Sequence, residues 1–248
     1  MRDFLAEDDR ALLESHGLAS FDALWALKLE AVDEPNVERG GWSSVFRLEL
    51  GERAYYLKRQ SNHLTRSLLR PLGEPTFARE FRNIQRYQQL GIPTLQASFF
   101  GSRKLAGERR AILLTRALDG WEDLDSCLAR WPQLDAPCQT AIVRAVGELA
   151  RDLHQAGQVH GCFYPKHIFL REQDGRWEAC LIDLEKTRPL LLGCRDRIKD
   201  LEPLLRRAQR MGSEGMRALL ATYLNDESAV EPWLQRLHQR RMDKESRA

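Results

Sequence analysis

The segment between His160 and Asp183 constrains the fold of this 248-residue chain more than any other. A His-Gly loop is followed by a short apolar run at residues 168–170, and Asp174-Gly175 is a strong two-residue signal for a β-hairpin turn. A second apolar run, residues 180–182, ends at Asp183. A carboxylate at the end of a buried strand is unfavourable unless it is paired or binds a cation. The segment therefore predicts a loop, a hairpin and then a functional carboxylate.

The same order of elements surrounds the active centre of kinases: catalytic loop, short strand, turn, short strand, metal-binding Asp. The kinase loop reads H-R-D-x-x-x-x-N, whereas this chain reads H-G-C-F-Y-P-K-H. Cys162 therefore takes the position of the general-base Asp, and His167 takes that of the metal-binding Asn. The architecture predicts a phosphotransferase in which two active-site identities are altered.

Three residues of this segment are the candidate catalytic residues: Cys162, His167 and Asp183. Asp183 is the first candidate ligand for a magnesium ion that bridges phosphates, with a turn-capping Asp as the alternative. His167 is the second candidate metal ligand, or else it contacts a phosphate, because magnesium prefers oxygen to imidazole nitrogen. Cys162 is not a simple replacement for Asp, since free thiols are mostly protonated at neutral pH. Glu185 is an alternative base, and His160 is interpreted as a structural residue that packs on the strand ending at Asp183.

A nucleotide-binding segment is expected between residues 39 and 45. Gly40 and Gly41, followed by Ser43 and Ser44, would let backbone N–H groups approach phosphates. The pattern G-x-G-x-x-G is absent, so a plain hairpin turn is the alternative.

Lys58 ends a strand-like run at residues 54–57 and is the candidate for holding the α- and β-phosphates. Glu80, at the edge of the apolar stripe of the next helix, is its expected partner. The alternative is an exposed Lys at a strand end and a solvated Glu.

The remaining pattern predicts an α+β fold of the protein-kinase-like, two-lobed type, with a small sheet-rich lobe followed by a helical lobe. We expect two domains: residues 1–118 contain N-terminal helices and the nucleotide-binding lobe, and residues 119–248 contain the catalytic loop and metal site. Helices are expected at 7–16, 20–28, 75–90, 135–157 and after 193, strands at 45–50, 54–57, 98–100 and 110–115, a loop at 59–74, a turn at 102–108 and a connection at 118–122.

The overall charge gives no indication of nucleic-acid binding, because 38 Lys and Arg balance 36 Asp and Glu. Five cysteines without a C-x-x-C pair indicate reduced thiols rather than a disulfide framework or a zinc site. The acidic N-terminus lacks the apolar stretch of a signal peptide, and no run of eighteen apolar residues predicts a membrane span. We therefore expect a cytoplasmic protein.

The string from His160 to Phe169, with I-D-L-E-K-T-R after it, resembles the lipopolysaccharide kinase InaA family. That family is similar to the WaaP core-heptose kinases and, more distantly, to the Kdo kinases. WaaP-type members carry H-R-D-x-Y-x-x-H, which Tyr164 and His167 match and from which Cys162 departs.

The resemblance implies ATP with magnesium as the donor system and a sugar hydroxyl of the lipopolysaccharide core as the acceptor. It leaves open whether the protein contacts the inner face of the inner membrane. Basic clusters at residues 66–70, 103–110 and 206–210 could bind an anionic acceptor or a membrane surface, with solvated helix faces as the alternative. By analogy with kinases, Asp200 would anchor the catalytic loop.

Three other functions remain open. The loss of Asp at Cys162 favours a pseudokinase that binds nucleotide as a regulatory module with little transfer, whereas Lys58, Glu80 and Asp183 argue for chemistry. A small-molecule kinase of the aminoglycoside type shares the His-Gly start but keeps the Asp. A protein kinase is the weakest alternative, because no Ala-Pro-Glu segment follows Asp183.

Overall fold

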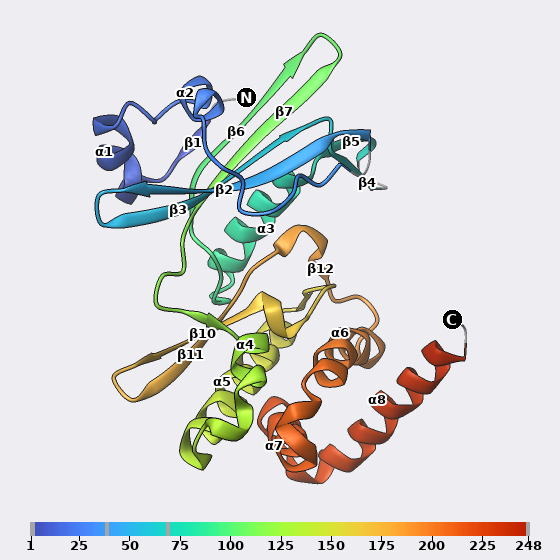
Figure 1. The fold of residues 1–248 in the computed structure, drawn as a ribbon. Coiled ribbons are helices and arrows are strands. Elements are labelled where there is room, and N and C mark those ends of the chain that lie inside the picture. The colour runs from blue at the N-terminus through green and yellow to red at the C-terminus, as the bar shows by residue number, and fades with distance from the viewer. Residues whose placement is uncertain (1–2, 38–39, 68–69, 247–248) are drawn as a thin grey trace. The chain divides into compact units, whose positions relative to one another are not determined.

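The computed structural model describes residues 3–37, 40–67 and 70–246. The chain forms two compact units (Figure 1). Unit 1 consists of Met1–Arg86 and Leu95–Asp119, and unit 2 consists of Tyr87–Thr94 and Gly120–Ala248.

Unit 1 is built on a five-stranded antiparallel sheet with the strand order β1-β6-β7-β3-β2. Its elements are β1 (Phe4–Leu5), α1 (Glu7–Ser15), α2 (Phe21–Ala26), β2 (Trp42–Leu50), β3 (Arg53–Ser61), β4 (Leu64–Ser67), β5 (Arg70–Pro75), α3 (Thr76–Gln89), β6 (Ala97–Leu105) and β7 (Glu108–Arg116). The last three residues of α3 belong to unit 2.

The two faces of this sheet have different partners because side chains alternate along β3. Tyr55 and Leu57 are fully buried and share an apolar cluster with Leu24 of α2. Lys58 points to the opposite face, where its Nζ reaches Glu80 of α3. The helices α1 and α2 thus cover one face of the sheet, and α3 covers the other.

A buried carboxylate attaches α1 to the sheet. Asp9 is 1% exposed and accepts hydrogen bonds from the Tyr55 hydroxyl at 2.9 Å and from Nε of Arg116 at 3.0 Å, and Arg53 Nη1 lies 2.9 Å away. Burial opposes ionisation of Asp9, but the interactions with Arg116, Ser98 and Tyr55 outweigh it and hold its pKa below the ordinary value.

Replacing Asp9 by Asn should lower the free energy of unfolding by about 2 kcal/mol, because two arginines and a tyrosine lose their shared anion. The depressed pKa means that this stabilisation is present above the unfolded-state pKa of about 3.9 and is lost as the pH falls through the folded-state value. Urea denaturation at neutral and acidic pH measures both effects. Asp8→Asn, at a carboxylate whose side chain is 85% exposed, is the matched control and should change little. Equal stability of the two variants would contradict the account.

Unit 2 is built around the long helix α5. Its elements are β8 (Glu122–Asp123), α4 (Leu124–Ala129), α5 (Ala136–Gln155), β9 (Gln158–Val159), β10 (Ile168–Gln173), β11 (Arg176–Leu181), β12 (Arg188–Pro189), α6 (Cys194–Arg207), α7 (Gly212–Leu224) and α8 (Val230–Glu245). Asp135 caps α5 by accepting a hydrogen bond from the Cys138 N–H at 2.8 Å, and a Pro lies in the first turn. A Cβ at Gly147 would lie 2.8 Å from Thr222, so α5 and α7 approach closely there.

The predicted hairpin is present as β10 and β11, and β8 adds a third strand to it. Asp174 and Gly175 have φ values of 52° and 75°, which the two central residues of a type I′ turn require. The strand β9, which directly precedes the candidate catalytic loop, pairs with β12 in a small two-stranded sheet. The α+β expectation is therefore confirmed, with an antiparallel sheet before a helical region.

One predicted connection is wrong, and two others differ in their bounds. The described residues within 59–74 are mostly in strands, because β3 continues to Ser61 and the paired strands β4 and β5 follow. Within this segment Gln60 is polar yet fully buried, and its side-chain oxygen accepts hydrogen bonds from Thr76 and from the Phe77 N–H at the start of α3. The turn predicted at 102–108 is shorter because β6 and β7 extend into it, and the connection predicted at 118–122 ends in β8. The prediction also missed β1, β9, β12 and α4.

Candidate active site

The His160 loop is attached to α6 by one carboxylate. Asp200 is 4% exposed, and it accepts hydrogen bonds from the N–H groups of His160 at 2.7 Å and Gly161 at 2.8 Å. Its third partner is Nε2 of His154 at 3.2 Å, and Nδ1 of that ring lies 2.9 Å from the Tyr223 hydroxyl. Asp200 therefore anchors the loop, as predicted, and a buried chain of hydrogen bonds through His154 fixes its orientation.

Gly161 is required by the path of this loop. Its φ is 78°, and a Cβ at this position would lie 2.6 Å from the carbonyl oxygen of Lys186. A side chain is therefore excluded both by the backbone conformation and by the neighbouring backbone.

His160 is fully buried and acts as a structural link, as predicted. Its Nε2 donates a hydrogen bond to the Ile182 carbonyl at 2.9 Å, and its Nδ1 accepts one from the Cys162 N–H at 3.3 Å. Burial lowers the pKa of His160, which keeps the ring in the neutral form that these two contacts need. The ring joins the start of the loop to the residue before Asp183.

His167 and Asp183 form the centre of the site. Nδ1 of His167 lies 2.9 Å from the carbonyl oxygen of Cys162 and must therefore carry the hydrogen. In the neutral ring, Nε2 then has a lone pair, and it faces Oδ2 of Asp183 at 3.3 Å. Burial lowers the pKa of His167, which opposes protonation of Nε2. Nε2 and Oδ2 are both electron-pair donors, so their close approach is stabilised when a cation binds to both atoms.

The backbone holds the Asp183 carboxylate in a strained position. Asp183 has φ 58° and ψ 59°, the left-handed conformation that Asp adopts more readily than most residues. Its side chain is 42% exposed, and the residues before it are fixed by hydrogen bonds from the Ile182 N–H to the His167 carbonyl at 3.0 Å and from the Thr94 hydroxyl to the Leu181 carbonyl at 2.9 Å. Strain of this kind, held by its surroundings, often marks a functional residue.

Cys162 is 7% exposed, and its thiol interacts with the amine of Lys186. The charge interaction with Cys162 is the main cause that raises the pKa of Lys186, and a raised pKa favours the charged form of the amine. The backbone carbonyl of Cys162 accepts hydrogen bonds from Nδ1 of His167 and from the Tyr164 N–H. The backbone carbonyl of Cys162 thus positions His167, and this role does not depend on the Cys162 side chain.

In unit 1, Lys58 and Glu80 form the predicted ion pair. The Nζ–Oε1 distance is 2.7 Å, and the two side chains are 17% and 3% exposed. The Lys58 amine also lies 5.9 Å from the centre of the Phe77 ring. Lys58 and Asp183 belong to different units, and their joint action on a nucleotide stays a prediction.

The glycine segment before β2 differs from the expected turn. Gly40 has φ 76°, but Ser43 and Ser44 already lie within β2, and the Ser43 N–H donates to the Asn36 carbonyl at 2.8 Å. A Cβ at Gly41 would lie 2.2 Å from the Ser61 carbonyl oxygen. The missing side chain of Gly41 therefore makes room for the backbone at Ser61. Of the expected segment, Arg39 lies outside the described residues. The role of the segment in nucleotide binding stays a prediction.

Comparison with known proteins places this geometry in a family. The model of the lipopolysaccharide kinase (Kdo/WaaP) family matches residues 22–223. The chain belongs to the lipopolysaccharide kinase (Kdo/WaaP) family. Protein InaA of Escherichia coli (strain K12) is 33% identical over 171 residues, which cover 68% of this chain and 78% of that protein.

A solved structure of WaaP in complex with acyl carrier protein has the same fold, with a TM-score of 0.69 and 24% identity, and the match covers 97% of this chain and 99% of that one. The predicted family and kinase-like fold are therefore confirmed. Membership in a kinase family implies phosphotransferase chemistry and the use of ATP.

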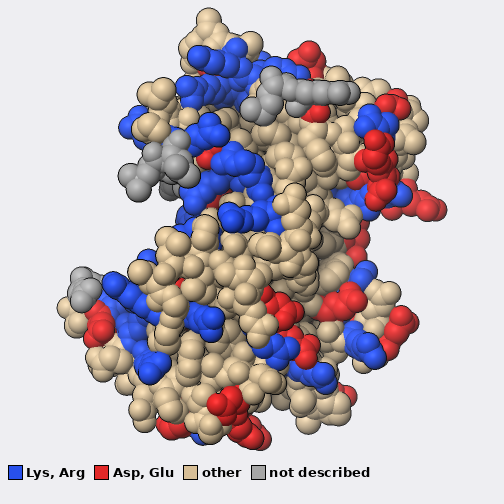
Figure 2. Space-filling model, turned by 180° about the vertical axis from the view of Figure 1, so that it is seen from behind, with Lys and Arg blue, Asp and Glu red and all other residues tan. Residues whose placement is uncertain are grey.

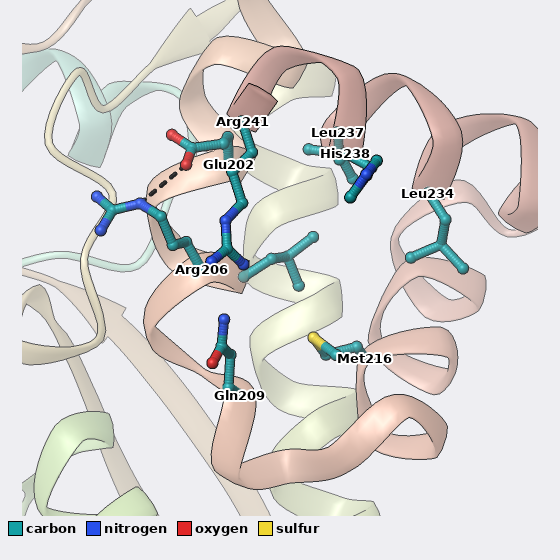
Figure 3. A pocket seen from close by; sticks show the side chains of 9 residues that line it. Glu202, Arg206, Gln209, Met216, Leu234, Leu237, His238 and Arg241 are labelled. Atoms are coloured by element: carbon teal, nitrogen blue, oxygen red, sulfur yellow. Dashed lines mark hydrogen bonds and ion pairs between the residues drawn. The ribbon is translucent and has the colours of Figure 1, made fainter. Parts of the chain in front are cut away.

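Two of the hollows in unit 2 of this Kdo/WaaP family member lie beside α6 and α8. A groove of about 340 Å³ lies among α6, α7 and α8, with Leu234, Leu237 and Met216 on its wall and Arg206 and Arg241 nearby (Figure 3). A second hollow, of about 310 Å³, is lined by residues of the catalytic loop, α6 and α8. No helix in the described part of the chain has both the length and the apolar character needed to cross a membrane.

The sequence interpretation missed several residues that support the site. His154 contacts Asp200, which anchors the loop, and Thr94 bonds to the strand before Asp183. The pKa of Lys186 is raised mainly by its charge interaction with Cys162. Arg207 stacks on the Tyr164 ring at 3.9 Å. The apolar stripe of α5 contains His154 at a buried position, and this was the one available signal, since a His among buried apolar residues needs a polar partner.

Proposed function

We propose that this protein is an ATP-dependent kinase that phosphorylates a sugar hydroxyl of the lipopolysaccharide core. Family membership supports phosphoryl transfer from ATP, and the family's description names lipopolysaccharide as the substrate class. The convergence of His167 Nε2 and Asp183 Oδ2 at 3.3 Å carries the proposal, because a phosphotransferase needs such a pair to bind a metal.

The site residues fit a magnesium ion in part. Magnesium in phosphotransferases is bound by one or two protein ligands together with phosphates and water, and the Asp183 oxygen is the preferred kind of ligand. The His167 nitrogen is a weaker one. When bound, the ion would neutralise charge on the phosphates. The chain itself would hold the phosphates through Lys58, which Glu80 orients, and would aim Asp183 through the His160 and Asp200 contacts.

Cys162 is not required as a base in this proposal. Phosphoryl transfer depends mainly on positioning and on charge stabilisation, so an acceptor hydroxyl can react without a strong base at this position. The backbone carbonyl of Cys162 fixes the tautomer of His167, which is a role that any residue type could fill.

Thermal unfolding with ATP, with and without magnesium, tests the proposal. Magnesium with ATP should raise the melting temperature more than either alone. Lys58→Ala should weaken ATP binding by about tenfold. Lys104→Ala, at an exposed lysine of β6, should leave it unchanged. No stabilisation by ATP under any condition would refute nucleotide binding.

A pseudokinase is the second candidate function, and the thiol at Cys162 favours it. Transfer of radiolabelled phosphate from ATP to purified lipopolysaccharide core distinguishes the two. Binding of ATP without transfer to any core preparation would support the pseudokinase.

A pH profile provides a further test of His167. Because burial lowers the pKa of His167, Nε2 stays unprotonated down to the ordinary histidine value of about 6.5 and below it. Affinity for magnesium and ATP should therefore be constant at neutral pH and fall in acid, as a proton competes for Nε2. Titration calorimetry should show that this fall is reduced in His167→Asn and kept in His16→Asn, a change at an exposed histidine. An unchanged profile in His167→Asn would exclude this role.

Acyl carrier protein is a proposed partner. One solved structure with the same fold is that of WaaP in complex with acyl carrier protein. The groove among α6, α7 and α8 supports the idea, because its apolar wall of Leu234, Leu237 and Met216 suits an acyl chain (Figure 3). Size-exclusion chromatography with purified acyl carrier protein should show a complex that Leu234→Gln weakens. Separate elution of the two unmutated proteins would contradict the partnership.

A further inference from the structure

The connection between β12 and α6, residues 190–193, exposes two adjacent leucines. Leu191 is 75% exposed and Leu192 is 58% exposed. Single exposed apolar residues are common on protein surfaces, but neighbouring ones at the tip of a connection indicate an interaction surface. We call residues 190–193 the leucine loop.

The backbone of the leucine loop is satisfied from inside the protein. The Leu190 N–H donates to the Gly157 carbonyl at 2.8 Å. The N–H groups of Leu191 and Leu192 both donate to Oδ2 of Asp196, at 2.9 and 3.0 Å. A segment that enters lipid must have its backbone polar groups paired, because lipid offers no partner for them. These three N–H groups already meet that condition.

One buried ion pair holds the loop in this form. Asp196 is 2% exposed, and Arg188 contacts both of its oxygens, at 2.7 and 2.9 Å. The hydrogen bonds from Arg188 hold the pKa of Asp196 far below its usual range, so the carboxylate stays charged. The loop is therefore fixed before any partner arrives, and little conformational entropy is lost when the leucines are covered.

Cations surround the base of the leucine loop. The hollow of about 310 Å³ that Arg188 and Asp196 help to line is also lined by Lys186, Lys199 and Arg240. None of these last three forms an ion pair with a carboxylate within residues 3–37, 40–67 and 70–246. The acidic groups of the hollow are already engaged by other partners: Asp196 by Arg188, Asp200 by the loop N–H groups, and Glu202 by Arg206.

The helix α8 extends this positive surface. Arg236, Arg240 and Lys244 are four residues apart and so lie on one side of the helix. Arg236 lies 3.2 Å from the sulfur of Cys194, the residue that follows the leucine loop. In the space-filling view, Lys and Arg side chains gather along α8 (Figure 2). An apolar tip beside a row of cations is complementary to one kind of surface, an anionic lipid membrane.

We propose that the leucine loop inserts Leu191 and Leu192 into the interface of an anionic membrane, while Lys199 and the cations of α8 contact lipid phosphates. The proposal does not depend on phosphoryl transfer, since it requires no nucleotide and no catalytic residue. It goes beyond the proposed function by naming the segment that would bring the protein to a lipid surface.

Vesicle flotation tests the proposal with the full chain. The unmutated protein should float with vesicles of phosphatidylcholine mixed with phosphatidylglycerol, and less with phosphatidylcholine alone, and salt should weaken the binding. The double variant Leu191→Ser with Leu192→Ser should bind at least about tenfold more weakly, because the apolar burial is lost. Lys199→Glu with Arg240→Glu should remove the preference for phosphatidylglycerol.

Leu72→Ser is the matched control, because Leu72 in β5 is 81% exposed and belongs to unit 1. It should bind vesicles like the unmutated protein. The double leucine variant should keep its stabilisation by ATP and magnesium, which separates failure of this proposal from failure of the proposed function. Equal flotation of the double variant and the unmutated protein would overturn the proposal, as would the absence of binding to either vesicle. A dimer that dissociates in the double variant, measured by light scattering, would also overturn it, because the leucines would then face a second copy.

Discussion

Asp183→Asn is expected to reduce phosphate transfer by at least about 100-fold, because it removes the charged oxygen that would bind the metal beside His167. The variant should still fold. Asn adopts the left-handed conformation at least as readily as Asp, and the side chain is 42% exposed, so neither the backbone nor the packing is disturbed. Initial rates of transfer from radiolabelled ATP measure the effect.

Asp174→Asn is the matched control for this experiment. Asp174 is also a left-handed aspartate of unit 2, with φ 52°, but it lies in the turn between β10 and β11. Its replacement should leave the rate unchanged. If Asp183→Asn retained full activity in the same assay, Asp183 would not be the metal ligand and the proposed site would be wrong.

Gly161→Ala should have the largest effect on stability. The added Cβ would lie 2.6 Å from the Lys186 carbonyl oxygen, and the φ of 78° disfavours any side chain. The two effects together should lower the free energy of unfolding by about 3 kcal/mol. Activity should fall as well, because relief of the clash moves the Gly161 N–H away from Asp200. Urea denaturation followed by tryptophan fluorescence gives the free energy.

Gly175→Ala separates the two causes. Gly175 has nearly the same φ, 75°, but a Cβ there would meet no atom within 4 Å. This control should cost about 1 kcal/mol, from the backbone conformation alone. Equal urea midpoints for Gly161→Ala and Gly175→Ala would show that the close approach to the Lys186 carbonyl is unimportant. They would contradict the interpretation that this contact requires glycine at position 161.

The sequence predicted the parts of the fold whose signals are local. The apolar spacing of α5 and the Asp-Gly turn between β10 and β11 depend on neighbouring residues, and both are present as expected. The anchoring role of Asp200 was found only by analogy, because its contacts lie 39 and 40 residues away along the chain.

Features that depend on tertiary contacts were not predictable in the same way. Gln60 is polar but fully buried because it pairs with the start of α3, so β3 extends into what resembled a loop. Gly41 looked like a residue that admits a phosphate, yet its missing side chain makes room for the backbone at Ser61. The interaction of Lys186 with Cys162 has no sequence signal, since an isolated Glu-Lys pair after a strand is usually solvated.

The position of Cys162 is the point at which pattern and geometry give different information. The pattern alone indicates a lost base. The geometry indicates that the backbone of Cys162 still orients His167. The interaction with Cys162 also raises the pKa of Lys186. Retention of the surrounding hydrogen bonds is what a working phosphotransferase requires, because positioning accounts for most of its catalysis.

Mass spectrometry of the lipopolysaccharide core tests the central claim most directly. Core oligosaccharide would be compared between native-host cells that lack the protein and the same cells supplied with either the unmutated protein or Asp183→Asn. We expect one additional phosphate group on the core only when the unmutated protein is present. Identical core masses in all three strains would contradict the assignment of this protein as a lipopolysaccharide core kinase.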